Sequence, residues 1–281
     1  MKGKMQIIST TADLRARLSD EQVIAFVPTM GNLHEGHLDL VRIARQHGSF
    51  VVVSIFVNPL QFGPGEDFDK YPRTLEADCA RLQGLADVVF APTVEEMYPE
   101  RQAVFVEPPP IANELCGAAR PGHFRGMATV VLKLLNIVQP QVAVFGKKDY
   151  QQLHIIRRMV AQLNLPVLVI GGETVRAADG LALSSRNQYL NGAERGEAVF
   201  LHRTLQVMRQ AMLGGERDFE RLQRQAVESL VSRGWSVDYV EVRSQSGLER
   251  AGTGPQPGEW VILAAARLGN TRLLDNVEVC F

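Results

Sequence analysis

The stretch VIAFVPTMGNLHEGHLDLVRIARQH, residues 23–47, sets the pattern for the N-terminal part of this 281-residue chain. Its first five residues form an apolar run that ends at a proline, which is typical of a short buried strand. After a polar loop, apolar residues recur at helical spacing at Leu38, Val41 and Ala44. The stretch therefore predicts a strand, a loop rich in glycine and histidine, and a helix in immediate succession.

The same alternation continues along the chain. Apolar runs at 50–57, 87–90, 142–145 and 167–170 predict further strands, with helices at 74–85, 126–138 and 150–162. Short apolar strands that alternate with helices indicate a parallel α/β sheet covered on both faces. After about Val175, two amphipathic helical segments, 193–212 and 219–232, precede three alternating strands, 237–242, 260–266 and 271–279. We therefore expect an α/β domain over 1–175 and a smaller C-terminal α+β domain over 176–281.

Charge and cysteine content exclude several classes of protein. The 30 basic and 31 acidic residues leave a formal charge of -1, which argues against nucleic-acid binding through a broad basic face. Cys79, Cys116 and Cys280 are far apart and show no zinc-binding spacing, which fits a reducing cytosol. No apolar stretch is long enough to cross a bilayer, and residues 1–10 lack the apolar core of a signal peptide. These features predict a cytoplasmic protein without a membrane partner.

The loop at 28–37 contains the first candidate site, because ligands bind at the carboxyl ends of strands in open α/β sheets. Gly31 and Gly36 let the backbone approach a ligand closely, and the free N–H groups of a helix start favour an anion such as phosphate. His34 and His37 are three residues apart, so both could donate hydrogen bonds to that anion. A polar loop with incidental histidines and a zinc site are the alternatives. The sequence HEGH at 34–37 lacks the HExxH spacing of zinc-binding helices, and no third zinc ligand lies at a spacing typical of such sites.

Amide side chains follow the next predicted strand. Asn58 and Gln61 lie just beyond the run at 50–57 and could hold a small polar molecule without adding charge. On its own, however, Asn58-Pro59 is also typical of a simple turn.

Two later loops could bind a polyphosphate. Gly146, Lys147 and Lys148 precede a predicted helix, an order that suits phosphate but also a solvated basic turn. Two serines and an arginine at 184–186 could contact phosphates through several donors, or could belong to an ordinary loop.

Five segments together resemble the motifs of one known family. PTMGNLHEGH at 28–37 has the form of the HxGH signature of the nucleotidyltransferase superfamily, and VNPLQF at 57–62, RPGHFRG at 120–126, FGKKDYQQ at 145–152 and DGLALSSRN at 179–187 follow it. In this order they resemble the pantoate–β-alanine ligase (pantothenate synthetase) family. The resemblance implies a Rossmann-like nucleotide-binding domain and a homodimer. It also implies ATP-dependent joining of pantoate and β-alanine, through a pantoyl-adenylate, to give the coenzyme A precursor pantothenate with release of AMP and pyrophosphate.

The resemblance also implies roles for single residues. Catalysis would fall to His34, His37 and Lys148, and the C-terminal domain would act as a lid. Mg²⁺ would be bound mainly through the phosphates of ATP, with no metal site made by the protein. The residues expected to contact ATP are Met30, Gly31, His34, Gly36, His37, Gly146, Lys148, Asp149, Val175, Leu183, Ser184, Ser185 and Arg186, and those expected to contact pantoate are Asn58, Gln61 and Gln152, with Gln61 also touching β-alanine.

Two positions depart from the family pattern, and two other functions stay open. Lys147 stands where the family usually has glutamate, and Leu183 stands where methionine is common. His123 of RPGHFRG is expected to order its loop and to take no part in chemistry. One alternative is a different HxGH nucleotidyltransferase, which would not need the three amide side chains. The other is a module that binds a nucleotide without catalysis.

Overall fold

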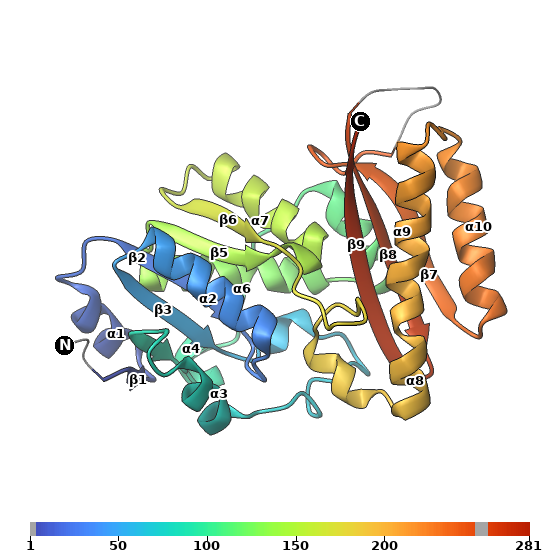
Figure 1. Cartoon of the computed structure of the whole chain (residues 1–281). Helices are drawn as coiled ribbons and strands as arrows, with labels where there is room; N and C mark the ends of the chain where they lie inside the picture. Colours follow the sequence, from blue (N-terminus) through green and yellow to red (C-terminus); the bar gives the residue numbers. More distant parts are fainter. Residues whose placement is uncertain (1–3, 251–257) are drawn as a thin grey trace. The chain divides into compact units, whose positions relative to one another are not determined.

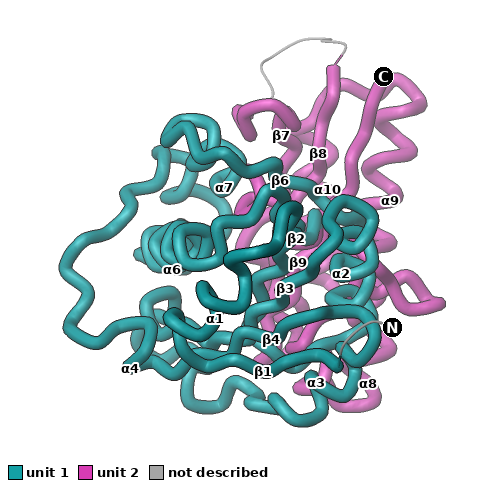
Figure 2. The backbone as a smooth tube through the Cα atoms, turned by 90° about the vertical axis from the view of Figure 1, so that its left-hand side faces the viewer, with its two compact units in different colours: residues 1–147, 155–173 teal, residues 148–154, 174–281 magenta. Residues whose placement is uncertain are grey.

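The computed structural model describes residues 4–250 and 258–281. The chain divides into two compact units, coloured separately in Figure 2: unit 1 holds residues 1–147 and 155–173, and unit 2 holds residues 148–154 and 174–281. The segment Lys148–His154 therefore belongs to unit 2, although a strand of unit 1 follows it in the sequence.

Unit 1 is built on a six-stranded parallel sheet (Figure 1). The strand order is β1-β4-β3-β2-β5-β6, so the chain adds β3 and β4 on one side of β2, and β5 and β6 on the other. Ligands bind where the strand order reverses in this way, outside the carboxyl ends of the strands. The strands are β1 (Gln6–Ile8), β2 (Ile24–Thr29), β3 (Phe50–Ile55), β4 (Val88–Phe90), β5 (Val142–Gly146) and β6 (Leu168–Gly172).

Helices pack on the sheet of unit 1 because its strands are apolar on both faces. Ala25 and Val27 of β2 share a buried cluster with Leu38 and Val41 of α2. The intervening Phe26 is fully buried as well, as expected for a central strand of a covered sheet. The helices are α1 (Thr11–Leu18), α2 (Glu35–His47), α3 (Leu75–Leu82), α4 (Val94–Met97), α5 (Cys116–Ala119) and α6 (His123–Val138), with the short 3₁₀ turns η1 (Pro59–Gln61) and η2 (Pro110–Asn113). Two further elements, η3 (Lys147–Asp149) and α7 (Tyr150–Gln162), are divided between the units, because residues 148–154 belong to unit 2.

Unit 2 packs helices on a three-stranded antiparallel sheet of order β7-β8-β9. Its core joins Leu205 and Met208 of α9 and Leu230 of α10 to Trp260 and Ile262 of β8. In Figure 1, α9 and α10 lie along this sheet. The elements are η4 (Ser185–Tyr189), α8 (Gly192–Glu197), α9 (Val199–Leu213), α10 (Phe219–Ser232), β7 (Ser236–Ser244), β8 (Glu259–Leu268) and β9 (Thr271–Cys280).

The expected fold class is confirmed: a parallel α/β sheet is followed by a smaller α+β part, and α7 and α10 have the predicted bounds. The single helix expected at 193–212 is wrong, because the chain turns at Ala198 and forms α8 and α9. Neither β1 nor α1 is predicted by the sequence pattern. β1 has only three residues, two of them exposed, and α1 buries only Leu14 and Leu18, so neither leaves a strong apolar pattern.

Candidate active site

The loop after β2 is shaped by a buried carboxylate. Asp78 of α3 is 2% exposed and accepts the backbone N–H groups of Asn32 at 2.9 Å and Leu33 at 2.7 Å. Gly31 has a φ of +81°, and a Cβ there would lie 3.1 Å from the Asp78 carboxylate, so glycine is required. Asp78 is not among the site residues expected from the sequence. Its only signal was an acidic residue at an otherwise buried position of the helix expected at 74–85.

The side chains of His34 and His37 cap the N-terminus of α2 reciprocally. The Gly36 N–H donates to Nδ1 of His34 at 3.2 Å, and the His34 N–H donates to Nδ1 of His37 at 3.2 Å. The two ring centroids are 4.1 Å apart. An Nδ1 that accepts a hydrogen bond carries no proton, so each neutral ring carries its proton on Nε2. The helix start therefore sets both histidines as Nε2 donors, the form that can bind a phosphate oxygen.

Asn58 and Gln61, both predicted to bind pantoate, are held together after β3. Asn58 is 1% exposed, and its Nδ2 donates to Oε1 of Gln61 at 3.0 Å and to the Gly126 carbonyl at 3.3 Å. Its Oδ1 accepts the Leu60 N–H at 3.3 Å and the Tyr98 hydroxyl at 2.7 Å. Both N–H hydrogens and both oxygen lone pairs of the Asn58 side-chain amide are therefore engaged in hydrogen bonds. Asn58 orients Gln61 and has no capacity left for a ligand.

Gln61, in contrast, keeps hydrogen-bonding capacity. Its Nε2 donates to the Met30 sulfur at 3.4 Å, and its Oε1 accepts from Asn58. Among the residues that the structure describes, none takes its second N–H or second lone pair. Gln61 can therefore both donate to and accept from a bound hydroxyl or carboxylate.

Tyr98→Phe tests this arrangement, because it deletes only the hydroxyl that donates to Asn58. Burial raises the pKa of Tyr98, so the hydroxyl stays protonated as a donor. We expect kcat/KM for pantoate to fall about fivefold, the value of one net hydrogen bond, with the KM for ATP unchanged. Steady-state kinetics measure both. Tyr239→Phe, in β7 of unit 2, is the matched control, and an equal loss in it would contradict the assignment.

The backbone of Gln61 is fixed by a second network. Arg120 pairs with Glu66 at 2.6 Å, and its Nη1 lies 3.0 Å from Nε2 of His123. Since arginine can only donate, Nε2 of His123 accepts, and its Nδ1–H donates to the Gln61 carbonyl at 2.8 Å. A Cβ on Gly126 would lie 2.0 Å from the Leu60 carbonyl oxygen, so only glycine allows α6 to approach η1 this closely. His123 therefore joins Arg120 of its own loop to the Gln61 carbonyl, which agrees with the ordering role expected from the sequence.

Glu66→Gln is expected to remove a contribution to stability that depends on pH in a defined direction. Burial by itself raises the pKa of Glu66, but the hydrogen bond and charge of Arg120 outweigh it and lower that pKa. The pair therefore stabilises the fold fully above the ordinary glutamate pKa and loses this effect as pH falls through the lowered value. At pH 7 the variant should lose about 1 kcal/mol of unfolding free energy.

Urea unfolding of the wild-type chain and the Glu66→Gln variant at pH 7, 5 and 3 measures this difference. The gap between the two chains should close toward pH 3. A gap that is the same at all three pH values would show that the Glu66 charge is not its source.

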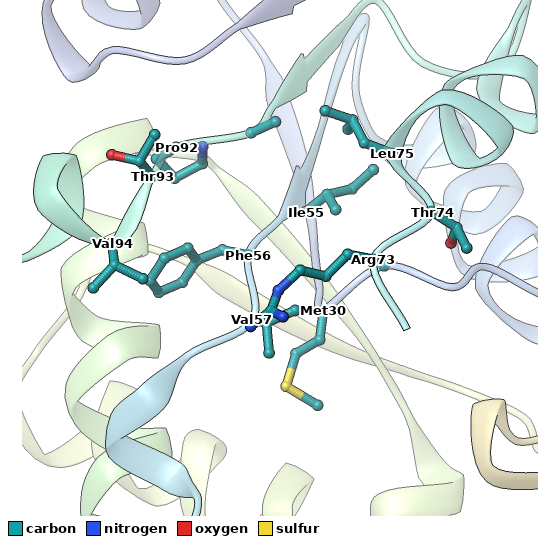
Figure 3. Close-up of a pocket in the computed structure, with 12 residues that line it drawn as sticks. Met30, Ile55, Phe56, Val57, Arg73, Thr74, Leu75, Pro92, Thr93 and Val94 are labelled. Carbon is teal, nitrogen blue, oxygen red and sulfur yellow. The ribbon is translucent and has the colours of Figure 1, made fainter. Parts of the chain in front are cut away.

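A cavity of about 330 Å³ lies at the carboxyl ends of β2, β3 and β4, lined by residues 30–31, 55–57, 73–75 and 91–94 (Figure 3). Its walls are mostly hydrocarbon, with the Arg73 guanidinium as the charged group. It shares Met30 and Gly31 with the first motif but includes neither histidine and neither amide of the predicted site. The residues at 74–75 begin the helix expected at 74–85, and those at 91–94 lie outside every element and motif expected from the sequence.

The second lysine of FGKKD is the one held in unit 2. The Lys148 carbonyl accepts from Asn276 Nδ2 at 2.9 Å, and its Nζ lies 3.8 Å from Oδ2 of Asp149. In unit 1, β5 ends at Gly146, and Lys147 forms a 2.6 Å ion pair with Glu173. Gln152 lies in the first turn of α7 in unit 2 and is partly exposed.

The DGLALSSRN segment of unit 2 is a small hairpin followed by a turn. The Leu183 N–H donates to the Val175 carbonyl at 3.0 Å, and the Ala177 N–H to the Leu181 carbonyl at 2.8 Å. Ser184 then caps η4 by accepting the Arg186 N–H at 3.3 Å. Leu183 and residues 184–186 are each partly exposed, so the predicted phosphate contacts lie at an accessible turn.

The structure thus brings together Met30, Asn58 and Gln61, and joins His34 to His37, within unit 1. Lys148, Asp149, Gln152 and the segment 175–186 lie in unit 2. The described residues include no group of three or more His, Cys, Asp or Glu side chains able to hold a metal ion. Among the helices that the structure describes, none has the length and apolar character needed to span a membrane.

Comparison with known proteins identifies one family over nearly the whole chain. The family model for pantoate-beta-alanine ligase matches residues 6–278. Pantothenate synthetases of Methylobacillus flagellatus and Chromobacterium violaceum are each 58% identical to this chain, over 275 and 277 residues, with at least 98% of every chain covered.

Solved structures agree as well. The pantothenate synthetase of Thermus thermophilus superposes with a TM-score of 0.93 at 48% identity, covering 99% of this chain and 100% of that one. The Francisella tularensis ligase, solved with beta-gamma ATP and beta-alanine, has a TM-score of 0.80 at 34% identity, covering 97% of each chain. By its sequence over nearly its whole length and by its fold, the chain belongs to the pantoate–β-alanine ligase family.

Proposed function

We propose that the chain catalyses the reaction for which its family is named, the joining of pantoate to β-alanine at the expense of ATP, with release of AMP and pyrophosphate. The observation that carries the proposal is the paired histidine start of α2, which sets two Nε2 donors at the carboxyl end of β2. The Francisella relative solved with ATP and β-alanine supports the same substrates here.

ATP is the first substrate to place. His34 and His37 donate to phosphate oxygens from unit 1, where Gly31, Gly36 and Gly146 allow close approach of the backbone and Met30 adds a further contact. In unit 2 the Lys148 ammonium supplies charge, and Ser184, Ser185 and Arg186 supply further donors to the triphosphate. Asp149 accepts hydrogen bonds from the ribose hydroxyls of ATP, and Val175 and Leu183 lie near its adenine base.

Pantoate is bound by neutral amides. Gln61 offers a donor and an acceptor, which suits pantoate hydroxyls and carboxylate, and Gln152 adds a second amide. Asn58 acts on pantoate through Gln61, because its own hydrogen-bonding groups are all engaged. A nucleotidyltransferase with a phosphate acceptor would have no use for this neutral set.

Mg²⁺ is proposed as a partner of ATP. The ion would be held through phosphate oxygens, its usual mode with nucleotides. When bound, it would neutralise charge on the triphosphate.

The reaction runs in two displacements. A pantoate carboxylate oxygen attacks the α-phosphorus, the bond to pyrophosphate breaks, and pantoyl-adenylate forms. The β-alanine nitrogen then attacks the acyl carbon, loses a proton, and AMP leaves with the carboxylate oxygen. The chain's own residues align the reactants and stabilise the developing charge. Because pantoate is activated on the nucleotide, the proposed route needs no acyl-enzyme.

Three further properties complete the proposal. The 176–281 part acts as a lid that excludes water from the mixed anhydride. The enzyme is a homodimer, as the family resemblance implies, and it works in the cytoplasm, which its cysteine usage favours. Sedimentation equilibrium tests the dimer.

Pyrophosphate exchange tests the central step. Because the adenylate forms before the amine is needed, labelled pyrophosphate should enter ATP with pantoate alone. After the full reaction, oxygen-18 from the pantoate carboxylate should appear in AMP. Exchange that strictly requires β-alanine would rule out this order, and exchange with another acceptor but not pantoate would favour the rival nucleotidyltransferase.

A further inference from the structure

Two adjacent polar residues are buried in β9 of unit 2, at a place where the sequence pattern predicts only an alternating strand. Asp275 is 4% exposed and Asn276 is 6% exposed. Buried polar side chains need hydrogen-bond partners, and the identity of those partners shows what such residues do. Here the partners belong to two different loops.

Asn276 holds the loop that contains the phosphate-binding lysine. Its Nδ2 donates to the backbone carbonyl of Lys148 at 2.9 Å. This hydrogen bond fixes the main chain from which the Lys148 side chain extends. It is made to the backbone carbonyl and does not involve the side-chain ammonium. A carboxylate at position 276 would have nearly the same shape but could not donate to a carbonyl.

Asp275 holds the hairpin that precedes residues 184–186. Its two oxygens accept from Arg176 at 2.7 and 2.8 Å, and Arg176 also donates to the Gly180 carbonyl at 3.1 Å. His202 Nδ1 lies 3.2 Å from the same carboxylate. Burial by itself raises the pKa of Asp275, but His202 and Arg176 outweigh it and lower that pKa, so the carboxylate stays charged.

The hairpin transmits this anchoring to the phosphate-binding turn. The Leu183 N–H donates to the Val175 carbonyl at 3.0 Å, and Asn187 Nδ2 donates to the Ala182 carbonyl at 3.0 Å. Ser184, Ser185 and Arg186 lie between these two bonds in the sequence. Their backbone is therefore tied to the side of the hairpin that contains Val175 and Arg176.

We propose that Asp275 and Asn276 form a positioning pair that fixes the spacing between Lys148 and the Ser184, Ser185 and Arg186 donors. The two chain segments that bind the triphosphate are then held as one preorganised set on β9. This inference rests on the proposed function, because it assumes that both loops bind ATP. Preorganisation of this kind lowers the cost of binding, and small misplacement of a catalytic group is expensive.

Asn276→Asp is the sharpest test, since it removes one donor with little change in volume. The KM for ATP should rise about tenfold or more, while the KM values for pantoate and β-alanine stay within about twofold. In a Lys148→Ala background, Asn276→Asp should add little, because the side chain that it positions is gone. Asp275→Asn should raise the KM for ATP by the same route through the hairpin.

Asp238→Asn is the matched control, because Asp238 of β7 pairs with Arg272 of β9 at 2.7 Å and contacts neither loop. It should lower the melting temperature without changing the KM for ATP. An unchanged KM for ATP in folded Asn276→Asp and Asp275→Asn variants would overturn the inference. So would a full additive effect of Asn276→Asp in the Lys148→Ala background.

Two further outcomes of these experiments have a defined meaning. If the wild-type chain forms no AMP from ATP, pantoate and β-alanine, the proposed function itself fails. If both β9 variants fail to fold, Arg176→Lys replaces them, because Arg176 is only partly buried and lysine keeps the charge. A raised KM for ATP in Arg176→Lys supports the positioning pair, and an unchanged one overturns it.

Discussion

His37→Asn is expected to slow AMP formation at least ~10²-fold, the usual cost of a donor that stabilises developing negative charge. The ring of His37 has two tasks: its Nδ1 accepts the His34 N–H at 3.2 Å, and its Nε2 carries the proton offered to phosphate. Asparagine offers an acceptor for the cap but has no group that reaches as far as Nε2. Rapid-quench measurement of AMP formation gives the chemical step, and thermal unfolding shows whether the fold is kept.

His34 supplies the control for capping. Its Nδ1 accepts the Gly36 N–H, so His34→Ala should lose a helix cap, about 1 kcal/mol of stability, as well as activity. His34→Asn restores a preferred capping residue and should regain the stability without the activity. Near-wild-type AMP formation in folded His37→Asn would remove His37 from the chemistry.

The sequence predicts those parts of the molecule that depend on short-range pattern. β2, β3 and β5 are apolar runs, and α7 and α10 have regular helical spacing, so each was expected close to its observed bounds. The histidine loop was located because it follows a strand and opens a helix. β1 could not be predicted, because three residues that pair with β4 far along the chain carry no local signal.

The shape of the site depends on long-range contacts, which the sequence does not show. Asp78 lies 45 and 46 residues beyond the two N–H groups that it accepts, and Tyr98 lies 40 residues beyond Asn58. These side chains become neighbours only when the sheet has formed. For the same reason the sequence does not show that Asn58, expected as a pantoate ligand, donates to Gln61.

Lys148→Ala is the second large effect that we expect. The ammonium of Lys148 is a compact positive charge. Its removal leaves part of the negative charge of the triphosphate uncompensated in both the ground state and the transition state. The KM for ATP should rise and kcat should fall, so that kcat/KM for ATP drops at least ~10²-fold. Asn276 still donates to the backbone carbonyl at position 148, so the loop itself should keep its place. Steady-state kinetics with varied ATP measure both constants.

Lys147→Gln is the control that separates the two lysines. Lys147 pairs with Glu173, whose side chain is 78% exposed, and such a surface pair stabilises a protein by only about 0–1 kcal/mol. Its loss should leave kcat/KM for ATP within about twofold of the wild-type value, whereas Lys148→Gln should be as harmful as Lys148→Ala. Because both variants remove one positive charge from adjacent positions, a general electrostatic effect would lower activity equally in both. A greater loss in Lys147→Gln would mean that the phosphate-binding lysine of this loop has been assigned to the wrong residue.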